Sequence, residues 1–323
     1  MKRKLDAGSL LGTYGVVLAL IALVAFGWWR YENFLGLFNV MSVLRYNSMF
    51  ALVALGMCFV IMTGGIDLSV GSTAALGSVA AALASPYGII PGAVAGTGVG
   101  LLVGLINGLL VTRLAIMPFI ATLATMLAAS GTALLLANNQ SVSVSYDSGF
   151  TTIGQGNLWI LPVPAVIAAV AYALGSVLLN FTSTGRTVLA IGGNEEASRL
   201  MGLRTDAIKF LTYAASGGFA GLAGVILASQ FGAGQPIEGV GWELFAIASV
   251  VVGGTLLTGG VGSVGTTLAG VLLLGILFNV LNFENGMGWI SLSAYWQSVI
   301  RGAFLLVVVV IQARLMTRTA PAG

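Results

Sequence analysis

The stretch Met62-Thr-Gly-Gly-Ile-Asp-Leu-Ser-Val-Gly-Ser72 interrupts apolar sequence that begins near Val40 and continues to Ser85. Its paired glycines disfavour a continuous helix, because glycine loses more conformational freedom on folding than any other residue. The stretch also holds Asp67, an acidic residue with long apolar sequence on both sides. Backbone groups freed by such a break are tolerated inside a membrane only where protein or a watery cavity surrounds them. The pattern therefore predicts a membrane protein with broken helices.

The composition of the whole chain also indicates a membrane protein. Hydrophobic residues make up 58% of the 323 residues and charged residues only 7%, whereas a soluble domain carries about 25% charged residues. The 13 basic and 10 acidic side chains are too few to cover a soluble protein of this length. We expect an all-α polytopic protein with a single transmembrane domain over residues 1–323, embedded in membrane lipid and without a nucleic-acid partner.

Several kinds of chemistry are excluded by the residues that are missing from the sequence. The chain has no histidine, so catalysis and metal binding by histidine are ruled out. Its single cysteine, Cys58, cannot form an intrachain disulfide or a cysteine cluster. No lysine follows glycine in a phosphate-binding loop of the P-loop pattern. We expect no catalytic residue, metal site or cofactor in this chain, and any ATP would be bound by a partner.

Ten apolar runs are long enough, or nearly long enough, to form transmembrane helices, which need about 20 residues. The third and eighth runs are the short ones. The runs are Leu10 to Trp29, Val40 to Met62, Leu68 to Ser85, Ile89 to Thr112, Ile116 to Ala137, Trp159 to Phe181, Ala207 to Gln230, Glu243 to Leu257, Val261 to Leu281 and Trp296 to Ala313.

The distribution of charge orients these runs in the membrane. With both termini in the cytoplasm, ten of the 13 Lys and Arg residues lie at inner ends, and only Arg30, Arg45 and Arg301 lie at outer ends. All six tryptophans then fall at outer ends, where they are expected to form an interfacial belt, or alternatively to stack on a sugar or face a docking partner. They are Trp28, Trp29, Trp159, Trp242, Trp289 and Trp296.

Two glycine patterns describe how the helices pack and where they break. Five glycines recur every fourth residue from Gly92 to Gly108, which predicts close helix packing along one face. A second Thr-Gly-Gly break, within 257–266, repeats the break at Thr63, six helices further along the chain. Weak internal repeats with broken helices are common in transporter folds.

Two acidic residues are candidates for the translocation path. Asp67 either caps the third helix, with support from Ser69 or Ser72, or contacts a substrate or coupling ion. Glu243 lies at the outer start of the eighth run, where the helix dipole alone favours a carboxylate.

The segment 182–209 is the one strongly charged loop, and it is expected to lie in the cytoplasm. Asn194 is a predicted N-cap, with Glu195 and Glu196 in the first turn, Arg199 near the end and Gly202 as the stop signal. A solvated loop would leave Leu200, Met201 and Leu203 exposed, so docking of a partner is the better interpretation.

Three motifs resemble the permease subunit of ribose-type bacterial ABC sugar importers. They are Gly64 to Ser72, Ala190 to Gly202, and Glu243 to Thr255. The resemblance extends over nearly the whole chain. It implies an inner-membrane permease that pairs with a second copy or a paralogue. It also implies an extracytoplasmic sugar-binding protein and a cytoplasmic ABC ATPase that binds the ATP.

The same resemblance implies roles for individual residues. The segment from Glu196 and Ala197 to Gly202 is similar to the loop that couples such permeases to the ATPase; with its cap and first turn, the coupling residues are Asn194, Glu195, Glu196, Ala197, Arg199, Met201 and Gly202. Residues of the translocation path or its gate are Gly64, Gly65, Asp67, Ser69, Glu243 and Phe245. Two departures bear on the choice of sugar: Phe245 stands where an acidic residue is usual, and Cys58 where threonine is common.

Two other classes of function compete with an ATP-driven sugar importer. A secondary transporter would use Asp67 to carry a proton or a sodium ion. An intramembrane enzyme is disfavoured, because the chain lacks histidine and any convergent set of acid and base groups.

Overall fold

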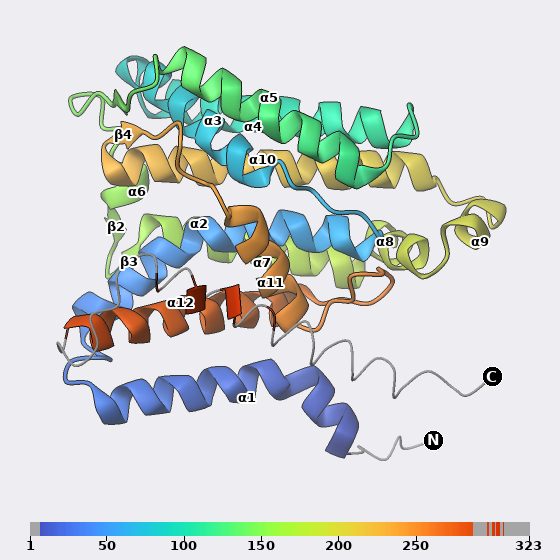
Figure 1. Ribbon diagram of the computed structural model, residues 1–323, viewed down its shortest axis with the longest axis horizontal. Helices are drawn as coiled ribbons and strands as arrows, with labels where there is room; N and C mark the ends of the chain where they lie inside the picture. Colours follow the sequence, from blue (N-terminus) through green and yellow to red (C-terminus); the bar gives the residue numbers. More distant parts are fainter. Residues whose placement is uncertain (1–6, 287–295, 297–298, 301, 304–305, 307–323) are drawn as a thin grey trace.

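The computed structural model describes residues 7–286, together with 296, 299–300, 302–303 and 306. In this part of the chain the protein is a helical bundle, and its strands are only two residues long (Figure 1). The predicted all-α class is confirmed. Six helices in the described residues are long and apolar enough to cross a membrane, as expected for a multi-pass membrane protein.

The first nine predicted runs each coincide with a helix, whereas the tenth, 296–313, falls largely outside the described residues. The nine helices are α1 (Ala7–Arg30), α2 (Leu37–Met62), α3 (Val70–Ala84), α4 (Ile89–Thr112), α5 (Pro118–Leu136), α7 (Val163–Phe181), α10 (Thr205–Phe231), α11 (Trp242–Val252) and α12 (Val264–Gly286).

Shorter elements connect these helices. On the side where α2 ends, α7 leads into α8 (Ser183–Gly193) and α9 (Glu195–Leu200). At the opposite end, two antiparallel pairs of strands close the loops. These loops contain η1 (Ser85–Tyr87), α6 (Thr152–Gln155), β1 (Val142–Ser143) paired with β4 (Ala233–Gly234), and β2 (Asn157–Leu158) paired with β3 (Leu161–Pro162).

The helix α11 is shorter than the sequence predicts. It has 11 residues, or about 16 Å of helix, against a hydrocarbon core of about 30 Å. The predicted end at Leu257 is wrong, because the helix stops at Gly253 and Gly254 adopts a positive φ of 86°. The turns that precede α11 reach α3, where Gly239 lies against Gly71, so Glu243 lies beside the first turn of α3 rather than at an outer helix end.

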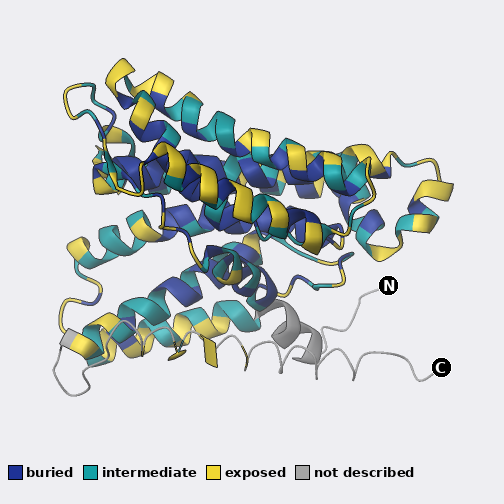
Figure 2. Ribbon diagram, turned by 45° about the horizontal axis from the view of Figure 1, so that its top comes forward, coloured by how far each residue is buried: buried dark blue, intermediate teal, exposed yellow. Residues whose placement is uncertain are grey.

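The centre of the bundle is formed by α10, which packs against α4, α3 and α2. Figure 2 shows α2 and α10 mostly buried, with exposed residues on the outer helices. The predicted glycine stripe faces this centre: Gly92, Gly96, Gly100, Gly104 and Gly108 are all buried. A Cβ atom on Gly100 would touch backbone atoms of Gly217 and Gly221 in α10. Close packing through the stripe is therefore confirmed.

The exposure of the tryptophans agrees with the predicted belt for only part of the set. Trp28, Trp29 and Trp159 are exposed, as side chains at a membrane interface would be. For Trp242 the prediction is wrong: this side chain is 6% exposed and packs against Phe50 in a tilted arrangement, with ring centroids 4.8 Å apart. The cause is the inward position of α11. Trp296 is exposed, and Trp289 lies outside the described residues.

Two neighbouring glycines of α4, one in the stripe and one outside it, should differ in how substitution by alanine changes the stability of the protein. Gly100→Ala should lower the stability of the protein by roughly 1–3 kcal/mol, because the new methyl group forces α4 and α10 apart. Gly98→Ala should leave stability unchanged or raise it by up to about 1 kcal/mol, since nothing lies within 4 Å of that position. Thermal unfolding in detergent measures both, and equal shifts would contradict the packing role.

Candidate functional site

Asp67 is completely buried in the unwound segment between α2 and α3. Its Oδ1 accepts hydrogen bonds from the backbone N–H of Ser69 at 3.0 Å and from the Ser69 hydroxyl at 2.6 Å. Its Oδ2 accepts one from the Ser216 hydroxyl of α10 at 2.8 Å. The carboxylate therefore fixes the start of α3 and ties it to α10. The residue that directly precedes α3 is Ser69, so Asp67 supports the cap from two positions earlier.

The hydrogen-bond network of Asp67 continues into two further helices. Asn107 of α4 donates to the Ser69 hydroxyl at 2.8 Å, and the Thr125 hydroxyl of α5 donates to the Asn107 amide oxygen at 2.6 Å. Among the ion pairs formed by the described residues, none includes Asp67. Hydroxyl and amide groups therefore compensate the buried carboxyl group. This arrangement supports the structural alternative for Asp67.

The first turns of α3 and α11 meet inside the bundle. A Cβ atom on Gly71, in the first turn of α3, would contact the Gly239 carbonyl oxygen and lie 2.8 Å from Oε2 of Glu243. The partly exposed Glu243 is thus close to the first turn of α3 as well as in the first turn of α11. Both helix starts carry positive partial charge. Glu243 therefore lies beside the first turn of α3, which begins directly after Ser69.

Phe245 belongs to an aromatic cluster instead of this polar region. Its ring centroid lies 4.5 Å from that of Phe50 in α2 and 5.7 Å from that of Phe278 in α12. Phe50 also packs against Trp242. Phe245 consequently connects α11 to two long helices. The sequence motif assigned Phe245 to the translocation path. The spacing of that motif does not indicate that Phe245 packs with aromatic residues of α2 and α12.

The two Thr-Gly-Gly breaks contact each other. The backbone N–H of Gly260 donates to the carbonyl oxygen of Met62 at 3.0 Å. A Cβ atom on Gly64 would lie 3.6 Å from the carbonyl oxygen of Thr258. Gly65, in turn, faces the Tyr213 hydroxyl of α10. The repeat seen in the sequence is therefore also a contact in space.

The end of α8 completes this junction. A Cβ atom on Gly192 would collide with the Met62 carbonyl oxygen and the Gly260 backbone nitrogen. Three chain segments thus meet through backbone atoms alone, at residues 62–64, 192–193 and 259–260. Sequence reasoning missed this junction, although a glycine pair lies in or overlaps each segment: Gly64–Gly65, Gly192–Gly193 and Gly259–Gly260. We call these three segments the glycine junction.

The charged loop forms the short helix predicted for it. The Asn194 side chain accepts a hydrogen bond from the Ala197 backbone N–H at 2.8 Å, which confirms the N-cap. Glu195 and Glu196 occupy the first turn of α9 and Arg199 the last turn. Gly202 follows the helix with a φ of 80°, as a stop signal requires.

Ion pairs fasten this loop to α10. Lys209 pairs with Glu195 at 2.9 Å, and Arg199 pairs with Asp206 at 2.8 Å. The tip of the loop remains open, because Leu200 and Met201 are 84% and 70% exposed. The preceding helix α8 was not predicted. Its start is capped by the Thr182 hydroxyl, which accepts from the Gly185 N–H at 3.2 Å.

Comparison with known proteins identifies the family. A family model described as the permease component of a branched-chain amino acid transport system matches residues 39–309, which include both breaks and the charged loop. The chain belongs to this permease family. The permease is thus a transport component rather than an enzyme. No solved structure matches it.

Three relatives resemble the permease along its length. The ribose import permease protein RbsC of Bacillus subtilis is 37% identical over 97% of this chain and 96% of its own. The L-arabinose transport system permease protein AraH of Escherichia coli is 35% identical over 96% and 93% of the two chains. The fructose import permease protein FruG of Bifidobacterium longum is 32% identical over 97% and 93%. The resemblance to ribose-type permeases is therefore confirmed.

The structural role of Asp67 is testable by replacing one carboxyl oxygen. Asp67→Asn should lower the stability of the permease by about 1–3 kcal/mol, because an amide nitrogen cannot accept the Ser69 or Ser216 hydrogen bond. Asp147→Asn, at an exposed position, should change stability by less than about 0.5 kcal/mol. Thermal unfolding of the purified variants measures the difference. An Asp67→Asn protein that keeps full stability but loses transport would show that Asp67 acts on the substrate instead.

Proposed function

We propose that the permease is the membrane-spanning subunit of an ATP-driven importer for a pentose, a hexose or a related polyol. The observation that carries this proposal is the similarity, over nearly the whole chain, to import permeases named for ribose, L-arabinose and fructose. The family description names branched-chain amino acids. Sugars are favoured because the sugar permeases match the chain from end to end. These relatives give no support to the ion-coupled alternative.

The charged loop is the proposed docking site for an ATPase subunit. The chain has no P-loop motif of its own, so a partner must bind the ATP. At the tip of the loop, Leu200 and Met201 present apolar surface, with Glu195, Glu196 and Arg199 around it. An apolar centre with a charged rim is typical of protein interfaces. Since positive charge gathers in this loop and near both termini, we place all three in the cytoplasm.

The short helices α3 and α11 are the proposed moving parts of the translocation path. Each begins inside the bundle after an unwound segment, and their starts meet at Gly71, Gly239 and Glu243. Substrate sites of many transporters lie where broken helices begin near the membrane midplane. In the proposed cycle, ATP binding and hydrolysis in the partner shift α8 and α9. The glycine junction then passes this displacement to the segments that precede α3 and follow α11.

Further partners follow from the proposed class. An extracytoplasmic binding protein would deliver the sugar to the end of the bundle opposite α9. A second copy of the permease, or a paralogue, would complete the pathway.

Transport by the reconstituted complex tests the proposed function. The permease is placed in liposomes together with the ATPase and the binding protein of its proposed transport system. We expect ATP-dependent uptake of ribose, arabinose or fructose and no uptake of leucine. The permease alone should import no sugar under a proton or sodium gradient. Leucine uptake, or sugar uptake driven by an ion gradient without ATP, would contradict the proposal.

The docking role of the loop is tested with the same complex. Glu196→Arg reverses an exposed charge in the first turn of α9, so it should reduce co-purification of the ATPase and sugar uptake together. Glu238→Arg makes the same change at an exposed position before α11, and it should leave ATPase binding intact. If Glu196→Arg binds the ATPase as well as the wild type does and still transports, docking lies elsewhere.

The glycine junction provides a matched pair of variants. Gly192→Ala introduces a methyl group into the backbone contact, which should displace α8 at a cost of roughly 1–3 kcal/mol. We expect this variant to bind the ATPase and hydrolyse ATP but to import less sugar per ATP. Gly193→Ala should behave like the wild type, since nothing lies within 4 Å of that position. The transmission role is wrong if both variants retain the same ratio of uptake to hydrolysis.

A further inference from the structure

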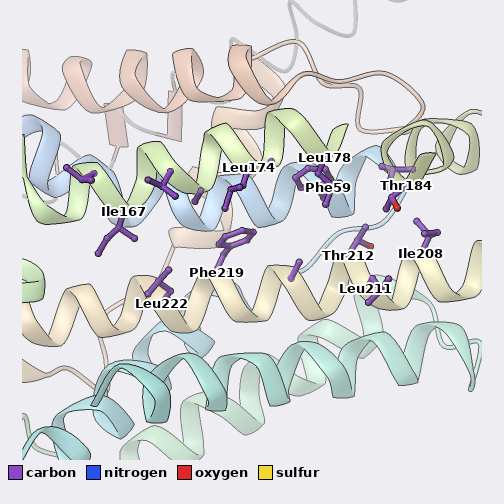
Figure 3. A pocket seen from close by; sticks show the side chains of 16 residues that line it. Phe59, Ile167, Leu174, Leu178, Thr184, Ile208, Leu211, Thr212, Phe219 and Leu222 are labelled. Carbon is purple, nitrogen blue, oxygen red and sulfur yellow. The ribbon is translucent and has the colours of Figure 1, made fainter. Parts of the chain in front are cut away.

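A deep groove separates α7 from α10 on the outside of the bundle. It has a volume of about 690 Å³, and α2 contributes Phe59 to its lining. Figure 3 shows side chains of α7, such as Leu174, facing side chains of α10, such as Phe219, across this space. Several lining residues are exposed, among them Leu174 at 65% and Leu211 at 55%. The groove is therefore open toward the lipid that surrounds the bundle.

The groove exists because α7 and α10 pack against α2 more than against each other. Small residues deepen its centre, namely Ala171 and Gly175 on α7 and Ala215 on α10. Only two of the lining residues carry a polar side chain, Thr184 and Thr212. The Thr212 hydroxyl donates to the Lys209 carbonyl oxygen at 2.8 Å, so its donor is already used. The lining is suited to a hydrocarbon chain and offers little to a sugar.

The length of the groove matches one leaflet of a membrane. On α10 it extends from Ile208 to Leu222, which is about 21 Å at the rise of an α-helix. One leaflet together with its headgroup region contributes about half of the roughly 40–45 Å total thickness of a bilayer. The Ile208 end lies at α8, which supplies Thr184 and Val188 to the lining. This end is on the side of the charged loop, so the groove begins at the proposed cytoplasmic surface.

Positive charge lies beyond that end of the groove. Arg204 precedes α10, and its carbonyl oxygen accepts the Ile208 N–H at 3.1 Å, so it lies one helical turn from the lining residue Ile208. Its side chain is exposed, and no ion pair in the described part of the chain includes it. Of the acidic residues in the same loop, Glu195 pairs with Lys209 and Asp206 with Arg199, whereas Glu196 is exposed and outside the described ion pairs. Arg204 is therefore available to a phosphate group at the membrane surface.

From these observations we propose that the groove holds an acyl chain of a phospholipid from the cytoplasmic leaflet, with the phosphate beside Arg204. The chain lies between α7 and α10, and the headgroup lies next to the loop α8–α9. Burial of each methylene group against the lining favours binding. The lipid fills the space that keeps α7 and α10 apart. This site is separate from the sugar path and does not depend on which substrate the permease carries.

Lipid retention by the purified wild-type permease is the first test. After extensive exchange into detergent, native mass spectrometry should detect a phospholipid that remains bound to each chain. Ala215→Phe fills the centre of the groove and should abolish this retention. Ala173→Phe adds the same side chain to an exposed position of α7 outside the lining, so it should retain the lipid. Absence of bound lipid in the wild type, or equal retention by both variants, overturns the proposal.

Arg204→Gln tests the position of the headgroup. In mixed phosphatidylglycerol and phosphatidylcholine, this variant should lose about fivefold of its preference for the anionic lipid, which is the contribution expected of one basic residue. An unchanged preference would contradict the proposed placement of the phosphate.

A measurement on the unmodified chain covers the case in which Ala215→Phe fails to fold. Phosphatidylglycerol with a photoreactive group on its acyl chain should label peptides that contain Leu174 or Leu211 in the wild-type permease. Labelling confined to other helices overturns the proposal. A cross-link from a Leu174→Cys variant to a second copy would also overturn it, because the groove would then be an interface between permeases.

Discussion

The structure depends on one constraint, which is that a backbone group leaving a helix inside a bilayer must find its hydrogen-bond partner within the protein. At the end of α2, the N–H groups of Thr63, Gly64 and Gly65 return to carbonyls of the last helical turn. The Met62 carbonyl is satisfied by Gly260 from the other break. At the start of α3, the free N–H of Ser69 is taken by Asp67. The buried carboxyl group is thus part of what allows a helix to start inside the bundle.

The same constraint explains why so much of the packing involves glycine. Where no side chain intervenes, two backbones approach closely enough to bond or to pack without lipid between them. This happens along the stripe of α4 against α10, and again at the glycine junction. The first contact holds the centre of the bundle together. The second joins the loop that carries α8 and α9 to both breaks through backbone contacts.

The polar network around Asp67, the charged helix α9 and the apolar groove therefore lie in different parts of the bundle. The network of Asp67, Ser69, Asn107 and Ser216 lies at the unwound segment, where backbone and carboxyl groups need partners. The charged helix α9 lies at one end of the bundle, with exposed apolar residues at its tip. The groove between α7 and α10 is almost wholly apolar and faces outward. Membership in the permease family fits this division, because such a subunit needs a path, a contact with its energy source and a surface adapted to lipid.

Local signals in the sequence were enough to determine the class of the protein, nine of its helices and the caps of α9. Hydropathy over 20 residues and the preferences of Asn194 and Gly202 depend on neighbours along the chain. Only the tertiary structure decided that α11 stops short, that Trp242 is buried, that Phe245 joins an aromatic cluster and that the two breaks meet at Gly192. These features arise from contacts between segments far apart in the chain, and periodicity contains no record of which segments will touch.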